Sequence, residues 1–585
     1  MKKLLSLVLA LCMALAVCAS ASALEIQDFP AVPEDYSKVV DPADPLKTIY
    51  SGAYRVAVSL DAGEGADQQD QGSGAEVTSE VTERSAVVYL AESYAQTQGF
   101  IMVVPATGTT PEQALEEGGW QAVADEYGLY LMVLDTTDAP ADAACLTAAA
   151  TLADSRDYWR QPEGRNYIVA YGDNVDAALL FTESMLPSTW AGIACFGATS
   201  VSDDDLIAAN ANGVELPVWL FTDDLTDEQS AAAAVLAVYN DCADSEALYL
   251  ADGTLVMTPN QQTTDMLLND QPMSQLRITV AADAAALNAD RAAQVYAWLK
   301  LGTREVGYGD KAMRYTHELS DWGATMEYIE IDGITRSYVQ YIPSTASAGN
   351  PVPVVVCLHG SALNGEYFAE RTGFIRLAEE FGFIALFPTG SITTGITPQW
   401  NYTCSEDNWD DVTFIKTMVD TVAANYPVDT SRLYVYGHSL GGMFTQRLIN
   451  YLPGYFAAAA GTGCTLASIL PEETLSVQTP IFVLMGENDL FGTSFSDDQV
   501  QTFVNYFTAS NGCSADKYIA YRTGRYQNYV YTNEDGVPMV RYSTVDDKPH
   551  TATLDEGMYI YEFLSQFSRG EDGSVIYGGG VTNAR

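Results

Sequence analysis

The segment that most restricts the fold of this chain is an apolar run that stops at a serine flanked by glycines. Residues 432–446, "RLYVYGHSLGGMFTQ", join an apolar run to a helical pattern through a G-x-S-x-G turn. Such a strand, tight turn and helix hold the serine in a strained backbone conformation and project its hydroxyl at the top of a sheet. Gly437 and Gly441 let the strand and the helix approach closely. We therefore predict a strand–turn–helix unit of an α/β fold centred on Ser439.

Apolar strands and helical segments alternate along the chain, which predicts α/β architecture with mainly parallel, doubly wound sheets. In the second half, residues 326–343 predict a hairpin-forming pair of strands, and "VPVVVCLHG" (352–360) predicts a strand buried on both faces. Residues 367–382 have helical spacing. "DDVTFIKTMVDTVAANY" (410–426) predicts a helix capped by Asp410 or Asp411.

The first half repeats the same order of segments. "NYIVAYGDNVDAALL" resembles the segment around Ser439, with Asn174 at the serine position, and "LPVWLFTDD" resembles "TPIFVLMGEND". The separation is 265 residues at the first pair (174 and 439) and 263 at the second (216 and 479). A near-constant offset predicts an internal repeat of one whole domain. The alternative is a separate α/β binding module of different descent, since doubly wound domains share this alternation.

The N-terminus predicts a signal peptide over residues 1–23, and therefore a secreted, extracellular protein. Lys2 and Lys3 precede an apolar run, and small residues at 21–23 suit cleavage. Lipid anchoring at Cys18 is less favoured, because the preceding Val17 is larger than the residue usually found there. No later stretch approaches the roughly 18 apolar residues of a membrane span.

The remaining chain is too long for one ordinary core, so we predict two domains, at 24–316 and 317–585. The formal charge of −49 repels nucleic acid and anionic lipid and keeps an exported protein soluble. The nine cysteines are sparse and lack C-x-x-C spacing, so no metal site and no cofactor is predicted. Export permits disulfides, but the sequence gives neither their connectivity nor the oligomeric state.

A nucleophilic serine needs a base, and the chain has only four histidines. His438 adjoins the serine and is expected to point elsewhere on the turn. His359 is expected to shape the loop after its strand, and His317 precedes the strands of the second half. His550, just before the last helical segment, is the remaining candidate.

The base needs a carboxylate that follows a strand between the serine and the histidine. "PIFVLMGENDLFG" offers Glu487 and Asp489, and the G-x-x-D turn favours Asp489. Asp546 and Asp547 are alternatives that lie too close in sequence to the histidine for a strand-end acid.

The predicted chain order is serine, aspartate, histidine, which is the order of α/β-hydrolases. A tetrahedral intermediate also needs hydrogen-bond donors. The main-chain N–H of Leu440, next after the serine, and that of Ser361, on the loop after "VVVCLHG", are predicted to form the oxyanion hole.

Four segments together resemble the secreted esterase family that contains polyhydroxybutyrate depolymerases, feruloyl esterases and acetylxylan esterases. They are "VVVCLHGSALNG", "WDDVTFIKTMVDTVAANYPVDTSRLYVYGHSLGG", "GEND" and "KPHT", and the resemblance covers roughly residues 325–570. It implies a serine esterase in which Ser439 is the nucleophile, His550 the general base and acid, and Asp489 the group that orients the histidine. It also implies a structural role for the paired aspartates Asp410 and Asp411.

The resemblance leaves the ester open. Plant cell-wall feruloyl or acetyl esters and polyhydroxyalkanoate-type polyesters are the expected substrates. Trp400, Tyr402 and Trp409 lie on a loop that is expected to line a pocket for an aromatic acyl group or a sugar. A prolyl-oligopeptidase-like serine peptidase is the alternative enzyme, although the strand–helix alternation before residue 310 argues against its β-propeller. A binding protein with two hydrolase-like modules is the non-enzyme alternative.

The first half is predicted to be a degenerate, non-catalytic α/β-hydrolase-like domain. Asn174 stands at the nucleophile position, and asparagine tolerates a left-handed backbone, so the turn is expected to keep its shape. Asp176 replaces the second glycine and is expected to crowd the turn. Residues 24–316 contain no histidine, so that segment cannot supply a serine–histidine mechanism. Packing, substrate presentation or regulation are its expected roles.

Overall fold

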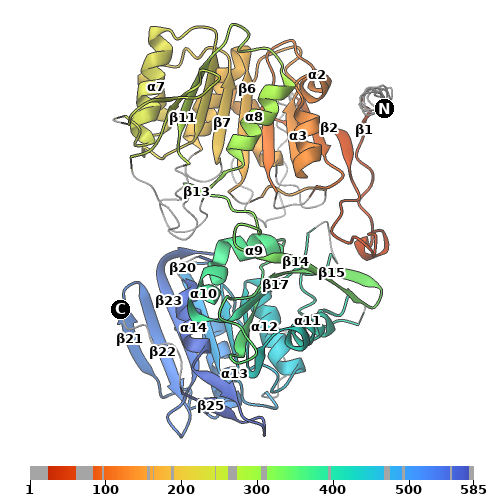
Figure 1. The fold of residues 1–585 in the computed structure, drawn as a ribbon, viewed down its shortest axis with the longest axis vertical. Helices are drawn as coiled ribbons and strands as arrows, with labels where there is room; N and C mark the ends of the chain where they lie inside the picture. The colour runs from red at the N-terminus through yellow and green to blue at the C-terminus, as the bar shows by residue number, and fades with distance from the viewer. Residues whose placement is uncertain are drawn as a thin grey trace, which may run out of the picture.

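The computed structural model describes residues 24–60, 83–94, 98–153, 158–162, 164–185, 190–243, 245–260, 273–304, 313–392, 397–406, 408–466, 475–490, 494–553 and 556–578. These residues form two α/β lobes that follow one another along the chain (Figure 1). The core of the first lobe extends to Met313, and the sheet of the second begins with the strand at residue 325. Each lobe is organised around a large hydrophobic core of its own.

The first lobe contains an eleven-stranded sheet in the order β1-β2-β3-β5-β4-β6-β7-β8-β11-β10-β9. Its strands are β1 (Ile26–Gln27), β2 (Gly52–Ser59), β3 (Glu83–Leu90), β4 (Phe100–Val104), β5 (Tyr130–Leu134), β6 (Asn166–Tyr171), β7 (Gly192–Phe196), β8 (Val218–Thr222), β9 (Leu248–Tyr249), β10 (Leu255–Met257) and β11 (Leu276–Val280). The neighbours from β5 to β11 in this order all pair in parallel.

The second lobe contains a ten-stranded sheet in the order β14-β15-β17-β16-β18-β19-β20-β23-β22-β21. Its strands are β14 (Thr325–Ile331), β15 (Ile334–Tyr341), β16 (Val352–Leu358), β17 (Ile384–Pro388), β18 (Val428–His438), β19 (Ala458–Thr462), β20 (Ile481–Asn488), β21 (Ile519–Thr523), β22 (Tyr526–Thr532) and β23 (Pro538–Pro549). The neighbours from β17 to β23 pair in parallel, and the hairpins at both edges are antiparallel.

The two sheets have the same strand order. From β2 to β9 in the first sheet, each strand occupies the place of one strand from β14 to β21 in the second, and only β1 is additional. The prediction of tandem α/β domains with mainly parallel, doubly wound sheets is thereby confirmed. In each sheet the order reverses beside the first central strand, β4 or β16, and such a reversal creates a crevice at the carboxyl ends of the strands.

Helices cover both sheets (Figure 1). In the first lobe they are α2 (Pro111–Glu116), α3 (Trp120–Tyr127), α4 (Ala143–Leu152), α5 (Val175–Ser184), α6 (Asp203–Ala209), α7 (Asp227–Tyr239) and α8 (Ala289–Leu299). In the second they are α9 (Gly365–Thr372), α10 (Phe374–Phe381), α11 (Asp411–Asn425), α12 (Leu440–Tyr451), α13 (Asp498–Ser510) and α14 (Glu556–Leu564).

One helical pattern in the sequence is divided in the structure. Residues 367–382, which have continuous helical spacing, belong to α9 and α10, separated at Gly373 with φ of 65°. Glycine adopts this left-handed conformation readily, so it ends the first helix and starts the second at a new angle. The paired aspartates have structural contacts: Asp410 caps α11 by accepting from the N–H of Thr413, and buried Asp411 pairs with Arg336 at 2.6 Å.

The lobes contact one another through several polar and apolar groups. A short pair of strands, β12 (Gly302–Arg304) and β13 (Met313–Tyr315), lies where the chain passes between them (Figure 1). The N–H of Thr335 donates to the carbonyl of Pro42, and Trp409 packs on the first core. Arg165 of the first lobe forms an ion pair with Glu370 on α9, and both side chains are largely buried.

Two further sequence predictions concern export. The predicted signal peptide, with Cys18, lies outside the described residues. Among the helices that the structure describes, none combines the length and the apolar character needed to cross a membrane. The cysteines of the described residues all have free thiols.

Candidate active site

Ser439 sits in a strained turn where β18 passes into α12. Its φ is 52° and its ψ is −119°, a conformation that a residue with a side chain rarely adopts. A side chain added at Gly437 would come within 2.2 Å of the carbonyl oxygen of Gly441, and one at Gly441 within 2.3 Å of that of Leu358. Only glycine fits at these two positions, so strand and helix meet directly beneath the serine.

Ser439, His550 and Asp489 form one hydrogen-bonded chain. Nε2 of His550 lies 2.9 Å from Oγ of Ser439, and Nδ1 lies 2.8 Å from Oδ1 of Asp489. The Asp489 side chain is fully buried, whereas that of His550 is 17% exposed. Because a carboxylate only accepts, Nδ1 carries the proton and Nε2 is left to accept from the serine hydroxyl.

The three side chains come from the carboxyl ends of parallel strands β18, β20 and β23. The alternative carboxylates contact other groups. Glu487 accepts a hydrogen bond from the N–H of Asp547 at 3.1 Å, and Asp546 pairs with Arg522. The structure therefore brings together the residues that the sequence favoured and leaves the alternatives in other contacts.

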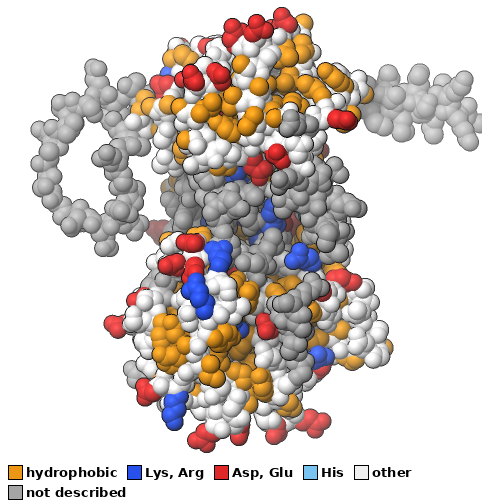
Figure 2. All heavy atoms as spheres, turned by 90° about the vertical axis from the view of Figure 1, so that its left-hand side faces the viewer, with side chains coloured by type: hydrophobic (Ala, Val, Ile, Leu, Met, Phe, Trp, Pro, Cys, Tyr) orange, Lys and Arg blue, Asp and Glu red, His pale blue; other side chains and the backbone are white. Residues whose placement is uncertain are grey.

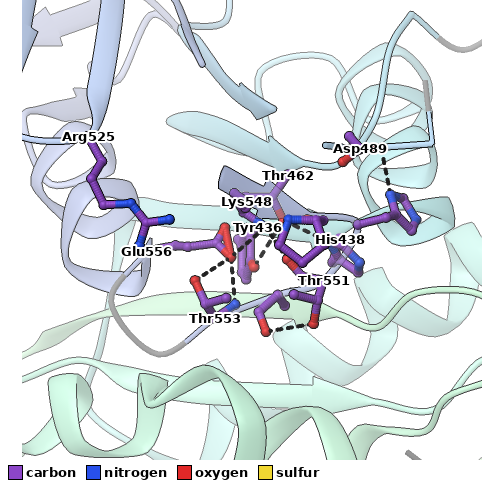
Figure 3. A network of polar contacts seen from close by, with 12 residues as sticks. Tyr436, His438, Thr462, Asp489, Arg525, Lys548, Thr551, Thr553 and Glu556 are labelled. Atoms are coloured by element: carbon purple, nitrogen blue, oxygen red, sulfur yellow. Dashed lines mark hydrogen bonds and ion pairs between the residues drawn. The ribbon is translucent and has the colours of Figure 1, made fainter. Parts of the chain in front are cut away.

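A buried ion pair holds the segment that carries His550 (Figure 3). Lys548 and Glu556 have fully buried side chains 3.3 Å apart. The Lys548 ammonium also donates to the carbonyls of Pro549 and Thr551, the two neighbours of His550. The sequence did not reveal this pair, because lysine and glutamate are mostly surface residues and nothing local marks these two as buried.

His438 lies beside the catalytic histidine candidate. Its ring centroid is 5.0 Å from that of His550, and its Nδ1 is 3.0 Å from the Thr462 hydroxyl (Figure 3). Burial, with the nearby charges of His550 and Lys548, holds the pKa of His438 well below its usual value. His438 was expected to point elsewhere on the turn; instead its ring contacts that of His550 as a neutral, buried neighbour.

His359 orients the peptide between Gly360 and Ser361, in the loop after β16. Its Nε2 accepts from the N–H of Gly390 at 2.9 Å, and its Nδ1 contacts the Gly360 carbonyl at 2.7 Å. Burial lowers the pKa of His359 to about 4, so the ring is neutral and donates from Nδ1. Because a trans peptide points its N–H opposite to its carbonyl, this bond fixes the direction of the Ser361 N–H.

The two predicted oxyanion donors lie on either side of the serine. Leu440 is the first residue of α12, so its N–H has no carbonyl partner within the helix. A side chain added at Gly360, just before Ser361, would come within 3.5 Å of Cβ of Ser439. The loop after β16 therefore passes directly beside the serine.

A cavity of about 400 Å³ opens at Ser439 and His550. It is lined by Arg160, Gly360, Ser361, Leu363, Tyr367, Phe368, Arg371, His438, Ser439, Leu490, His550, Thr551 and Ala552. Leu490 is 79% exposed beside the buried Asp489. Arg160 comes from the first lobe, between α4 and β6, and no pattern in the sequence connects it to a site some 200 residues away.

A larger cavity, of about 850 Å³, lies in the first lobe. Its lining includes Asp44, Tyr89, Glu92 and Asp125, with no histidine among its described residues. Size alone would favour this cavity as a ligand site. The smaller cavity has the serine, histidine and aspartate in hydrogen-bonding order, and chemistry takes precedence over volume here.

The three aromatic residues predicted to bind substrate do not line the cavity of Ser439. Trp400 is 2% exposed, stacks on Phe444 and donates from its indole N–H to the carbonyl of His359. Trp409 packs on the first core, and Tyr402 packs on the second. Trp400 is covered by its neighbours, whereas Tyr402 and Trp409 are partly exposed away from this cavity, so the structure places none of the three against Ser439.

The first lobe has a different turn at the corresponding position. Asn174 has φ of −92° and ψ of −3°, so the left-handed turn expected of it is absent. The side chain is fully buried: its oxygen accepts from the N–H of Ala141 at 2.7 Å, and its amide donates to the carbonyl of Pro105 at 2.6 Å. Asp176 does not crowd the turn either, since its carboxylate accepts from Thr199 and the N–H of Ser200.

One polar group of the second site has a counterpart in the first lobe. Asp223 accepts from the N–H of Ala284, and these residues lie 61 apart, as do Asp489 and His550. The numbers differ by 266 at both positions, close to the 265 between Asn174 and Ser439. The aligned segments "LPVWLFTDD" and "TPIFVLMGEND" contained this signal, which the sequence analysis did not use.

The fold and the site define an α/β-hydrolase arrangement in the second lobe: a serine on a strained turn, a histidine and a buried aspartate, in the order of that fold. Residues 336–471, which run from β15 past β19, match the family described as "Esterase PHB depolymerase". The family resemblance predicted for this half is confirmed by that match. Among the described residues, no group of three or more His, Cys, Asp or Glu side chains is placed to hold a metal ion.

Relatives with curated names match part of the chain. The chain is 25% identical over 258 residues to "Bifunctional acetylxylan esterase/xylanase XynS20E" of Neocallimastix patriciarum, covering 43% of this chain and 36% of that protein. It is 24% identical over 251 residues to "Poly(3-hydroxyalkanoate) depolymerase C" of Paucimonas lemoignei, covering 37% and 59%. Of the solved structures, "Acetyl xylan esterase from Aspergillus awamori" aligns at 16% identity with a TM-score of 0.34, over 41% of this chain and 98% of that chain. The chain thus spans less than two thirds of the length of these two curated relatives.

Proposed function

We propose that this protein is a serine hydrolase that cleaves carboxylic esters through an acyl-enzyme on Ser439. The observation that carries the proposal is the hydrogen-bonded chain from Ser439 through His550 to buried Asp489, which opens into a cavity. A serine hydroxyl is a weak nucleophile by itself, and a neutral imidazole at hydrogen-bond distance activates it by accepting its proton.

In the first half of the reaction, Oγ of Ser439 attacks the ester carbonyl carbon while Nε2 of His550 takes the hydroxyl proton. The carbonyl π pair moves to oxygen, and the N–H groups of Leu440 and Ser361 stabilise that oxyanion. When the carbonyl re-forms, the alkoxide leaves with the proton from His550. Asp489 stays ionised and stabilises the imidazolium.

In the second half, water replaces the alcohol. His550 accepts a proton from the water as its oxygen attacks the acyl carbon, and the collapsing intermediate releases the carboxylic acid and returns the proton to Oγ of Ser439. Both halves use the same donors and the same base, so one site serves the complete hydrolysis.

The names of the relatives favour two substrate classes, acetylated xylan and poly(3-hydroxyalkanoate). A third relative, "Feruloyl esterase B" of Thermothelomyces thermophilus, adds feruloyl esters. We propose plant cell-wall acetyl or feruloyl esters, or hydroxyalkanoate polyesters, as substrates. A panel of acetyl, feruloyl and 3-hydroxybutyrate esters, tested on the full chain for kcat/KM, ranks the three classes.

A fluorophosphonate probe tests the nucleophile, because it forms a covalent bond only with an activated serine. We expect labelling of the full chain at a single peptide that contains Ser439, and none in Ser439→Ala. Activity on esters, with none on proline-containing peptide anilides, separates this function from that of a prolyl-oligopeptidase-like peptidase. Absence of labelling and of ester hydrolysis would contradict the proposal and favour a binding protein.

Export is part of the proposal, since the sequence predicts a signal peptide over residues 1–23. Expression with the native leader should release a chain that begins near Leu24 into the medium. N-terminal sequencing of that material checks the cleavage position, and retention of residues 1–23 in a cell-bound form would contradict it.

A further inference from the structure

Arg160 is a side chain of the first lobe that lines the cavity of the second. Its Nη1 donates to the carbonyl oxygens of Ser361, at 3.4 Å, and Ala362, at 3.1 Å. These carbonyls belong to the loop between β16 and α9, whose Ser361 N–H is the proposed oxyanion donor. The first lobe therefore holds the loop on which the proposed chemistry of the second depends.

The loop between β16 and α9 has a strained backbone that needs contacts from outside the loop to hold it. Ala362 has φ of 60°, a left-handed conformation that a residue with a side chain adopts only where its surroundings impose it. Its N–H donates to the carbonyl of Pro398 at 3.0 Å. Because a trans peptide points its two polar groups in opposite directions, the Ser361 carbonyl points away from Pro398, and Arg160 meets it there.

Arg160 projects from a rigid base. The Tyr94 hydroxyl accepts from the main-chain N–H of Arg160 at 3.1 Å and donates to its carbonyl at 3.2 Å. Tyr94 is buried and packs edge-on against Tyr130 of β5, and the neighbouring Trp159 is buried as well. The main chain from which the guanidinium group extends is therefore held by the core of the first lobe.

A second contact joins the two lobes beside the loop without touching it. Arg165 pairs with Glu370 on α9, which begins at Gly365, three residues after Ala362. Figure 2 shows several Lys and Arg side chains around the middle of the molecule, with Asp and Glu side chains beside them as well as at both ends. In so acidic a chain, basic groups at the junction favour docking of the lobes.

We propose that Arg160 is a positioning residue for the oxyanion loop, so that the first lobe, without chemistry of its own, completes the active site of the second. This inference rests on the proposed ester hydrolase function. It assigns the first lobe a part in turnover rather than in packing alone. A hydrogen bond from a charged donor is stronger than one between neutral groups, so it suits the task of holding a short strained loop in one conformation.

The test is Arg160→Met in the full chain. We expect kcat for a small acetyl ester to fall about 10- to 100-fold with KM within about twofold, because a 1 Å misplacement of a catalytic group can lower the rate about 100-fold. Arg160→Lys keeps a charged donor but loses the fork, so an intermediate kcat is expected. Wild-type kcat in Arg160→Met would overturn the proposal.

The matched control is the double variant Arg165→Gln/Glu370→Gln. It removes an ion pair at the same junction without leaving a buried charge unpaired, and neither residue lines the cavity. We expect its kcat to stay near wild type. A loss equal to that of Arg160→Met would show that lobe docking in general, rather than the contact with the loop, sets the rate, which would overturn the proposal.

Two further measurements separate this proposal from the proposed function. If Ser439→Ala is inactive while Arg160→Met is fully active, the function stands and the positioning role fails. If the wild-type chain hydrolyses no ester, the function fails, and hydrogen exchange of the N–H groups at residues 361–363 decides the positioning role. Faster exchange in Arg160→Met supports it, and unchanged exchange contradicts it.

Discussion

Ser439 and Asn174 occupy the same place in two sheets with the same strand order, and they do opposite things. Ser439 adopts a strained left-handed backbone and presents its hydroxyl to His550 in an open cavity. Asn174 adopts a relaxed right-handed backbone and buries its amide in two hydrogen bonds to Pro105 and Ala141. The same topology thus supports a strained, accessible polar group in one lobe and a satisfied, buried one in the other.

The carboxylate positions differ in a related way. Asp489 accepts from the ring of His550, whereas Asp223 accepts from the main-chain N–H of Ala284. In the first lobe, the loops at the corresponding positions are joined to one another by hydrogen bonds of Asn174 and Asp223. The difference teaches that two sheets with the same strand order can hold their polar groups either in an accessible chain or in internal hydrogen bonds.

The largest expected effect tests the two serine positions. Ser439→Ala should lower kcat about 10⁶-fold, the loss seen when a triad nucleophile is removed. Asn174→Ser is the matched variant: it adds a hydroxyl at the corresponding position but no histidine, so no second activity is expected. Steady-state kinetics on a chromogenic ester and probe labelling check both. Labelling of Asn174→Ser at residue 174 would contradict the view of the first lobe as silent.

The two aspartates give the next comparison. Asp489→Asn should lower kcat about 10⁴-fold, because an amide no longer fixes the tautomer of His550 or stabilises its charged form. Asp223→Asn is the control, since its partner is a main-chain N–H and an amide oxygen can still accept from it. Its kcat should remain at the wild-type value. Equal losses in both variants would mean that the aspartates act through folding.

Asn174→Ala should destabilise the first lobe by about 2–4 kcal/mol, because it leaves the Ala141 N–H and the Pro105 carbonyl buried without their partner. Ser439→Ala should change the stability of the second lobe by less than about 1 kcal/mol, since it removes only a catalytic hydroxyl and such groups seldom stabilise a fold. Urea unfolding followed by probes in each lobe measures both. Equal effects of the two substitutions on stability would contradict the view that Asn174 has a structural role and Ser439 does not.

The smallest expected effect concerns the helices after these turns. Glu183 on α5 is 1% exposed, and its counterpart on α12, 265 residues later, is the apolar Leu448. Burial raises the pKa of Glu183 from 4.5 to about 7. Between these values the unfolded chain has lost a proton that the folded chain keeps, so stability falls as pH rises.

This dependence yields a measurable slope. From pH 5 to pH 7 the first lobe should lose about 2 kcal/mol through Glu183, at about 1.4 kcal/mol per pH unit. Glu183→Gln keeps the shape and cannot ionise, so its slope should be flatter over the same range. Unfolding of both chains in urea at several pH values provides the test, and parallel curves would exclude Glu183 as the cause.

The parts predicted from the sequence were those fixed by local chemistry. Gly437 and Gly441 mark a turn that leaves no space for a side chain at either position. The periodicity of the apolar residues predicts which segments are strands and which are helices. The chain has few histidines, so elimination led to the one that lies 2.9 Å from Ser439. The prediction that Asn174 keeps a left-handed turn was wrong, because a residue that tolerates such a backbone does not have to adopt it.

The amino-acid sequence by itself determined the alternation of strands and helices and the strained turn. It also determined which serine, aspartate and histidine meet at that turn, because all of these depend on residue type and spacing. Only the tertiary structure decided which side chains border the cavity. Trp400 stacks on Phe444, and Arg160 of the first lobe donates a hydrogen bond to the carbonyl of Ser361 in the second. Burial and contact depend on what packs against a residue, and a partner 201 positions away leaves no mark on the local sequence.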